Sequence, residues 1–261
     1  MLAADLPLLI DAARIAGRVA TSFAGDTATR WDKPGDAGPV TEADLAVNDA
    51  LSATLRTARP DYGWLSEETE DDATRLSHDT VFIIDPIDGT RSFVEGSRTW
   101  AISIAIAHLG QVTAAVVYLP LRNRLYAAAH GAGAALNGQP IAVSNAAMSP
   151  ASTVLAARPI MDPKHWTDGI PDITRHYRPS LAYRLALIGE GRFDAMLTLR
   201  PSWEWDIAAG ALIITEAGGT ITDQTGAPLR FNNPHPTLNG VVAGSGPVHS
   251  ALAPRLKTYC A

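Results

Sequence analysis

The spacing of apolar residues predicts that the chain opens with two helices. In the first helix, apolar side chains recur every three or four residues and share one face: Leu8, Ala12, Ile15, Ala16 and Val19. We predict that Asp5 caps this helix and that Pro7 lies in its first turn. The segment Thr41-Glu42-Ala43-Asp44 has the pattern of a capped second helix, whose apolar stripe continues at Leu51 and Leu55.

Apolar runs farther along the chain predict strands, and the order of the elements divides the chain into two parts. The first part has a buried run, Val81-Phe82-Ile83-Ile84, and strand candidates at residues 100–107, 112–119 and 124–129. In the second part, strands alternate with helices, which favours α/β layering. Its strand candidates are residues 154–157, 195–199, 219–222 and 240–243, and its helix candidates are residues 181–190, 206–217 and a last helix after Ser245-Gly246-Pro247. We therefore predict an N-terminal α+β part over residues 1–145 and a C-terminal α/β part over residues 146–261.

The composition is that of a globular protein with no overall attraction for polyanions. Hydrophobic residues make up 46% of the 261 residues, charged residues make up 18%, and the net charge is −6. We therefore expect no nucleic-acid partner, and an anionic substrate must be attracted by local charge. The only cysteine is Cys260, and we find no signal-peptide pattern or membrane-spanning run. These features predict a soluble cytoplasmic protein without a membrane partner.

The most informative segment is Asp85-Pro86-Ile87-Asp88-Gly89-Thr90, which directly follows the buried run. Two carboxylates three residues apart at the end of a buried strand are costly to bury without a partner, and a divalent cation is a suitable one. The backbone N–H groups of Gly89 and Thr90, together with the Thr90 hydroxyl, suit an anion such as phosphate. The segment therefore predicts a metal-assisted phosphate site.

Two other segments complete the pattern. Ser66-Glu67-Glu68-Thr69 lies upstream, and Trp203-Glu204-Trp205-Asp206-Ile207-Ala208-Ala209-Gly210 lies far downstream. The three segments, in this order, resemble the inositol monophosphatase superfamily of Mg²⁺-dependent, often lithium-sensitive phosphatases, from about Lys33 to about Gly219. The resemblance implies a five-layered αβαβα sandwich of the inositol monophosphatase and fructose-1,6-bisphosphatase type. It also implies a homodimer that acts on a small phosphorylated metabolite.

The resemblance further implies a site for two or three Mg²⁺ ions, which prefer oxygen ligands. Asp85 would bridge two ions, with Glu67 and the Ile87 carbonyl on the first ion and Asp88 and Asp206 on the second. Two such ions activate a water and stabilise the leaving oxygen of a phosphate ester. No covalent nucleophile is then required, because phosphoryl transfer depends mainly on positioning and charge neutralisation.

Other residues of these segments have implied roles around the water and the phosphate. Thr90 and Glu67 would orient the attacking water, and the amides of Gly89 and Thr90 would hold the phosphate. Asp206 would also cap the helix that it begins. From residue type alone, an exposed position in an acidic run is the alternative for Glu67, and helix capping alone is the alternative for Asp206.

Lys33 and Asp44 form a third, upstream element. With Thr41, they have a spacing similar to that of the family's upstream segment. The resemblance implies that Asp44 supports a further metal through water and that Lys33 adds positive charge near the site. The alternatives are a solvent-exposed loop lysine and an acid that belongs only to a capping box.

The substrate side is predicted from Ser180-Leu181-Ala182-Tyr183-Arg184, which resembles the family's substrate-side segment. It makes Ser180 and Arg184 candidate contacts. Three other arginines could meet the phosphate or the leaving group, although an ordinary surface position is the alternative for each: Arg91, Arg158 and Arg200. We expect Trp203 and Trp205, beside the downstream aspartate, to pack in the core rather than to stack on substrate.

The identity of the ester depends on features outside the metal motif. Inositol monophosphatases usually carry an acid seven positions before the downstream aspartate, where this chain has Leu199. Residues 204–210 and Arg158 are more similar to the 3'(2'),5'-bisphosphate nucleotidase branch, so we predict hydrolysis of 3'-phosphoadenosine 5'-phosphate. Inositol 1-phosphate is an alternative, as is histidinol phosphate, which residues 85–93 suggest. A non-catalytic binding partner in RNA processing is a further alternative, disfavoured by the full ligand set and the negative charge.

Overall fold

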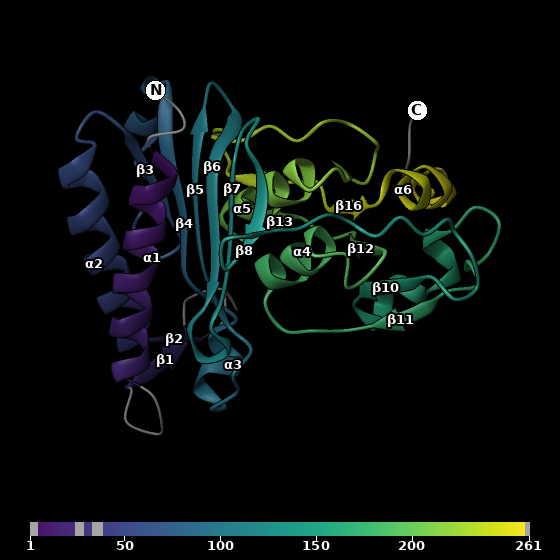
Figure 1. Cartoon of the computed structure of the whole chain (residues 1–261), viewed down its shortest axis with the longest axis horizontal. Helices are drawn as coiled ribbons and strands as arrows, with labels where there is room; N and C mark the ends of the chain where they lie inside the picture. The colour runs from purple at the N-terminus through teal and green to yellow at the C-terminus, as the bar shows by residue number, and fades with distance from the viewer. Residues whose placement is uncertain (1–4, 24–28, 33–38, 259–261) are drawn as a thin grey trace.

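The computed structural model describes residues 5–23, 29–32 and 39–258 of the chain and has five layers (Figure 1). These layers are a pair of helices, a seven-stranded sheet, a second pair of helices, a five-stranded sheet and a final helix. The predicted αβαβα sandwich is therefore confirmed. Within the described part of the chain, no helix combines the length and the apolar character that crossing a membrane requires.

The first layer consists of α1 (Asp5–Ser22) and α2 (Glu42–Ala58), which pack side by side on one face of the seven-stranded sheet (Figure 1). Their apolar stripes meet alternate side chains of the sheet, such as Phe82 and Ile84. The neighbouring side chains of the same strand, such as Val81, point to the opposite face and enter the central core. The sheet is therefore buried on both faces.

The helix starts in this layer differ from one another. α2 begins with the predicted capping box, because Asp44 Oδ2 accepts a hydrogen bond from the Thr41 amide at 2.8 Å. The prediction for Asp5 was wrong. Its buried carboxylate accepts hydrogen bonds from Arg59 Nε at 2.9 Å and from the Tyr62 hydroxyl at 3.1 Å. Asp5 therefore ties the start of α1 to the chain after α2 and does not cap the helix.

The seven-stranded sheet has the order β3-β4-β5-β6-β7-β8-β9, in which only β3 and β4 run parallel. The four predicted runs form β4 to β7, whereas β3, β8 and β9 were not predicted. The bounds are β3 (Gly63–Ser66), β4 (Thr80–Asp88), β5 (Ala101–His108), β6 (Gln111–Leu119), β7 (Arg124–Ala129), β8 (Gly133–Leu136) and β9 (Gln139–Pro140).

The central helices are α4 (Leu181–Gly189) and α5 (Glu204–Glu216), which lie between the two sheets (Figure 1). Both are apolar on nearly all sides, because a sheet or the other helix covers each face. Two glycines let the helices approach closely. A Cβ at Gly210 would lie 2.4 Å from Leu185 Cβ, and a Cβ at Gly189 would lie 2.8 Å from a methyl carbon of Ile213.

The second sheet has the order β11-β10-β12-β16-β14, and α6 (Gly246–Leu252) covers its outer face. Its bounds are β10 (Thr153–Ala156), β11 (Thr174–His176), β12 (Ala195–Thr198), β14 (Thr220–Thr222) and β16 (Val241–Gly244). The remaining short elements are β1 (Arg30–Asp32), β2 (Pro39–Thr41), α3 (Thr90–Val94), β13 (Ser202–Trp203) and β15 (Thr237–Leu238).

One apolar core runs from the seven-stranded sheet through α4 and α5 to the five-stranded sheet. The predicted division between residues 145 and 146 falls between the two sheets. Since the central core takes side chains from both sides of that point, each part buries its inner face against the other. The division into two parts stays a prediction.

Candidate active site

The end of β4 carries two of the predicted metal ligands on a β-bulge. Asp85 pairs with Ser103 of β5, and Asp88 pairs with Ala101, so β4 has one residue more than β5 between these pairs. In a regular strand, side chains three residues apart point to opposite faces. The bulge therefore allows the carboxylates of Asp85 and Asp88 to face the same side.

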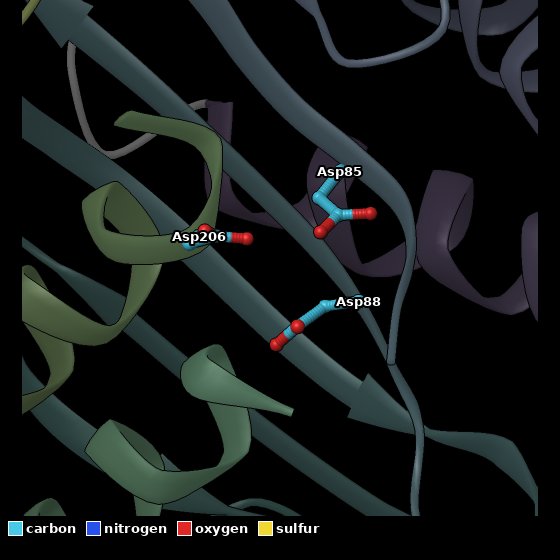
Figure 2. A group of neighbouring side chains, drawn as sticks. All are labelled: Asp85, Asp88 and Asp206. Atoms are coloured by element: carbon cyan, nitrogen blue, oxygen red, sulfur yellow. The ribbon is translucent and has the colours of Figure 1, made fainter. Parts of the chain in front are cut away.

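Asp206 reaches this place from the first turn of α5. The helix begins at Glu204, and its N-cap residue, Trp203, makes no side-chain capping bond. The prediction that Asp206 caps the helix was wrong, because it is the third helical residue and its carboxylate points toward the bulge (Figure 2). The Ser103 hydroxyl donates to the Trp205 carbonyl at 2.9 Å and fixes this turn against β5.

Three carboxylates thus converge from two elements that are far apart in the sequence (Figure 2). Oxygen atoms of Asp85, Asp88 and Asp206 all lie within 4.8 Å of one another. Glu67 follows β3, its amide donates to the Ile84 carbonyl at 3.1 Å, and its side chain lies within hydrogen-bonding reach of Asp85. All these donors are oxygens, the ligand type that Mg²⁺ prefers.

Burial and repulsion by neighbouring carboxylates raise the pKa values of Asp85 and Asp206. For Asp85, burial is the largest cause, followed by the negative charges of Glu67, Asp88 and Asp206. For Asp206, burial is again the largest cause, followed by the charges of Asp88 and Glu67. A divalent cation would offset both effects, since it neutralises buried charges that otherwise repel one another. The residues present therefore fit Mg²⁺.

Asp88 also binds the N-terminus of α4. Its Oδ1 accepts from the Leu181 amide at 3.1 Å, and its Oδ2 accepts from the Ser180 hydroxyl and the Ala182 amide, both at 2.6 Å. The pKa of Asp88 is raised because burial outweighs the lowering effect of these hydrogen bonds. The end of β4 is thereby attached to the central helix layer.

Thr90 and Asp44 connect the cluster to the outer helix layer. The Thr90 hydroxyl lies 3.1 Å from the Ile87 carbonyl oxygen and 3.2 Å from Asp44 Oδ1. Asp44 Oδ2 accepts from the Thr41 hydroxyl at 2.6 Å, so Asp44 serves the capping box and Thr90 together. Burial is the largest cause of its raised pKa. Gly89 has a φ of +100°, a left-handed conformation that favours glycine.

Two cavities adjoin at the site. The acidic cleft, of about 480 Å³, is lined by Glu67, Asp88, Gly89, Thr90, Ser180 and Asp206 among others. The arginine chamber, of about 430 Å³, is lined in part by apolar residues that include Ile160, Leu197 and Leu199. The two cavities have four lining residues in common: Arg91, Tyr177, Arg184 and Arg200.

A buried network holds the start of α5 against the loop after β3. The Glu204 carboxylate accepts from the amides of Asn232 and Asn233 at 2.6 and 2.9 Å and from Asn233 Nδ2 at 2.7 Å. Arg75 donates to Asn232 Oδ1 and the Asn233 carbonyl and pairs with Asp71. No sequence pattern predicted this network, because its members come from three distant segments.

Some predictions for individual residues have other outcomes. Lys33 lies outside the described residues. Arg158 is exposed and lines neither of the two cavities. Trp205 is buried as predicted, but the prediction was wrong for Trp203, which is 41% exposed and stacks on Trp205 with ring centroids 4.7 Å apart. Tyr177 lines both cavities and was not predicted, since its nearness to the Ser180 segment was the only available signal.

The sequence matches known proteins over nearly its whole length. The model of the inositol monophosphatase family matches residues 2–259. The chain is 31% identical to the inositol-1-monophosphatase of Mesorhizobium japonicum, over 97% of this chain and 96% of that protein. It is 30% identical to the Nus factor SuhB of Escherichia coli, over 97% of this chain and 95% of that protein.

Solved structures agree with this similarity. The extragenic suppressor protein SuhB of Bartonella henselae superposes with a TM-score of 0.83 at 28% identity, covering 97% of this chain and 98% of that one. An IMPase of Thermotoga maritima has a TM-score of 0.80 at 28% identity, covering 97% and 96% of the two chains.

Proposed function

The chain belongs to the inositol monophosphatase family of phosphoric monoester hydrolases, and from this premise we propose that it hydrolyses a small phosphate ester in a Mg²⁺-dependent reaction. The observation that carries the proposal is the convergence of Asp85, Asp88 and Asp206 within 4.8 Å beside an open cleft. Buried carboxylates with raised pKa values in a cleft are typical of functional sites.

In this proposal, five residues hold two ions. Glu67 and the Ile87 carbonyl would hold the first ion, Asp88 and Asp206 would hold the second, and Asp85 would contribute to both. Bound Mg²⁺ supplies charge neutralisation for the phosphate and a more acidic water. The raised pKa values of the cluster supply the electrostatic argument, because carboxylates that repel one another gain most from a cation.

The neighbouring residues position water and phosphate. The Thr90 hydroxyl and Glu67 would orient the attacking water. Asp44, which accepts a hydrogen bond from the Thr90 hydroxyl, would support a third ion. The amides of Gly89 and Thr90 hold the phosphate at the start of α3. Lys33, which adds positive charge in the sequence-based prediction, stays part of the proposal.

For the substrate, we propose 3'-phosphoadenosine 5'-phosphate. Leu199 lines the arginine chamber with other apolar residues, which suits a purine better than a polyol. Inositol 1-phosphate is the alternative that the name of the Mesorhizobium japonicum relative favours. Histidinol phosphate stays a third candidate. Inhibition by lithium, a homodimer and a cytoplasmic location complete the proposal.

The test is phosphate release by the full chain from these three esters, in Mg²⁺ and in EDTA. We expect release that requires Mg²⁺ and is fastest with 3'-phosphoadenosine 5'-phosphate. Faster release from inositol 1-phosphate would correct the substrate but keep the reaction class. Absence of release from all three esters would contradict the proposed function.

A second candidate function is a non-catalytic binding role in RNA processing. It is favoured by the 30% identity to proteins named Nus factor SuhB. The carboxylate cluster is complete in this chain, which favours catalysis over a vestigial site. Mg²⁺-dependent turnover that disappears in Asp88→Asn would exclude a purely non-catalytic role.

A further inference from the structure

The arginine chamber has a charge opposite to that of the acidic cleft. Its described lining contains Arg91, Arg184 and Arg200 and no carboxylate, whereas the acidic cleft contains four acidic residues besides the same arginines. Because the two cavities share those arginines, they adjoin along one wall. A ligand that fills both would place one end beside the carboxylates and the other end in a purely cationic, partly apolar space.

Arg184 lies in that wall and forms no salt bridge within 4.0 Å in the described part of the chain. Its side chain is only 8% exposed, and its Nε is a buried donor without a hydrogen-bond acceptor. The guanidinium carbon lies 5.4 Å from the centroid of the Tyr177 ring, a cation–π contact. A buried guanidinium with an unused donor is costly, and the cost is relieved when an anion binds. Arg184 therefore points to a ligand that carries negative charge.

The fixed charges decide where that anion lies. Asp88 and Asp206, which line the acidic cleft, attract Arg184, whereas the like charge of Arg200, which lines both cavities, repels it. An anion bound by Arg184 and Arg200 from the chamber would relieve this repulsion, and it would face a lining without carboxylates. Apolar side chains such as Ile160 and Leu199 then cover the rest of the ligand.

We propose that the arginine chamber binds the alcohol part of the substrate and that Arg184 and Arg200 bind a second anionic group on it. The inference rests on the proposed function and specifies its substrate class: phosphate monoesters whose alcohol part carries an apolar or planar body and a further negative charge. The alcohol part of an uncharged polyol phosphate offers the two guanidinium groups no second anion. The amino group of histidinol phosphate would meet three like charges in the chamber, so we expect this third candidate to be hydrolysed more slowly than the bisphosphate.

The test compares two esters that differ only in the second anion, 3'-phosphoadenosine 5'-phosphate and adenosine 3'-phosphate. With the full chain in Mg²⁺, we expect kcat/KM to be about 10- to 100-fold higher for the bisphosphate, the range for hydrogen bonds to a charged group. Arg200 is exposed, so Arg200→Gln tests the contact without disturbing the core. It should lower this ratio about tenfold. A wild-type ratio near one, or a ratio that Arg200→Gln leaves unchanged, overturns the proposal.

The matched control is Arg192→Gln, which removes an exposed positive charge that lines neither cavity. Arg192→Gln should keep the wild-type ratio of the two kcat/KM values. If this ratio fell as much in Arg192→Gln as in Arg200→Gln, the assignment of the second anion to the chamber would be overturned. If no ester releases phosphate, the proposed function fails. Equilibrium binding in Mg²⁺ then still tests whether the chamber binds an anionic group. Adenosine 5'-phosphate should bind about tenfold more tightly than adenosine and lose that advantage in Arg200→Gln. Equal binding of the two compounds overturns the inference.

Discussion

The Ser180 hydroxyl donates a hydrogen bond of 2.6 Å to Asp88 Oδ2 and thereby joins the N-cap of α4 to the end of β4. The same hydroxyl oxygen accepts from the Tyr183 amide at 3.1 Å, so one side chain serves the helix and the carboxylate. A proposed metal ligand is thus oriented by a helix of the central layer, 92 residues away in the sequence.

Ser180→Ala tests this arrangement. The variant removes a helix cap and one of the three donors to Asp88, so we expect the free energy of unfolding to fall by about 1 kcal/mol. We also expect several-fold weaker activation by Mg²⁺, measured by phosphate release over a metal titration. Ser245→Ala is the matched control, because Ser245 is the N-cap of α6 but makes no side-chain capping bond. Unchanged Mg²⁺ activation in Ser180→Ala would contradict a positioning role for the hydroxyl.

Asp206→Asn should reduce Mg²⁺-dependent phosphate release by orders of magnitude, since it removes a charged ligand from the proposed second ion. The fold should persist, because the Asp206 carboxylate does not cap α5. Circular dichroism and phosphate release measured on the same samples separate the two effects. Asp49→Asn, an exposed change on α2, should retain full activity. An active, Mg²⁺-dependent Asp206→Asn enzyme would remove this residue from the proposed site.

Asp85→Asn should stabilise the protein when no metal is present. Burial and the charges of Glu67, Asp88 and Asp206 raise the pKa of Asp85, so its ionised form is disfavoured in the folded state at neutral pH. Removal of this charge should raise the free energy of unfolding in EDTA by on the order of 1 kcal/mol. The melting temperature should then rise by a few degrees. The stabilisation of the wild type by added Mg²⁺ should disappear in the variant. A melting temperature of Asp85→Asn below that of the wild type in EDTA would contradict destabilising repulsion among these carboxylates.

Glu204→Ala should destabilise the protein by about 2 kcal/mol or more, because it leaves three partly buried donors of Asn232 and Asn233 without their acceptor. Urea unfolding of the purified variant measures this loss. Glu70→Ala, an exposed change in the loop after β3, should lie within about 0.5 kcal/mol of the wild type. Similar losses in both variants would contradict a specific role for the buried network.

His249 should make stability depend on pH. Burial lowers its pKa below the ordinary value of 6.5, and Thr222 Oγ1 lies 3.0 Å from its Nε2. Below about pH 6.5 the unfolded chain takes up this proton more readily than the folded chain, so stability falls as the pH drops toward 5. His249→Gln should remove on the order of 1 kcal/mol of that fall. His235→Gln, an exposed change, should keep the wild-type dependence, and equal curves for all three proteins would contradict the prediction.

Much of the layered fold could be predicted because long apolar runs and capped helices leave strong local patterns. The strands β4 to β7 and the helices α2 and α4 have such patterns. β3 has only four residues, and β8 and β9 are also short, so their pairing with longer strands, rather than their own sequence, makes them strands. Edge elements of this kind were therefore missed.

The candidate site was predictable only one segment at a time. The acidic residues were visible in their motifs, but the bulge that turns Asp85 and Asp88 to one side depends on the register between β4 and β5. The burial of Arg184 and the contacts of Glu204 with Asn232 depend on packing between distant layers. Tertiary contacts of this type have no counterpart in local sequence patterns.

The close approach of α4 and α5 at Gly210 has a consequence for ion selection. Asp88 is bound to the first residues of α4, and Asp206 belongs to the first turn of α5. The distance between these two carboxylates is therefore set by helix packing, which leaves no room for a methyl group at Gly210. Mg²⁺ and Ca²⁺ differ mainly in radius and in the rigidity of coordination that they demand. With the ion proposed for this site, the packing of the hydrophobic interior would therefore limit which ionic radius fits between the two carboxylates.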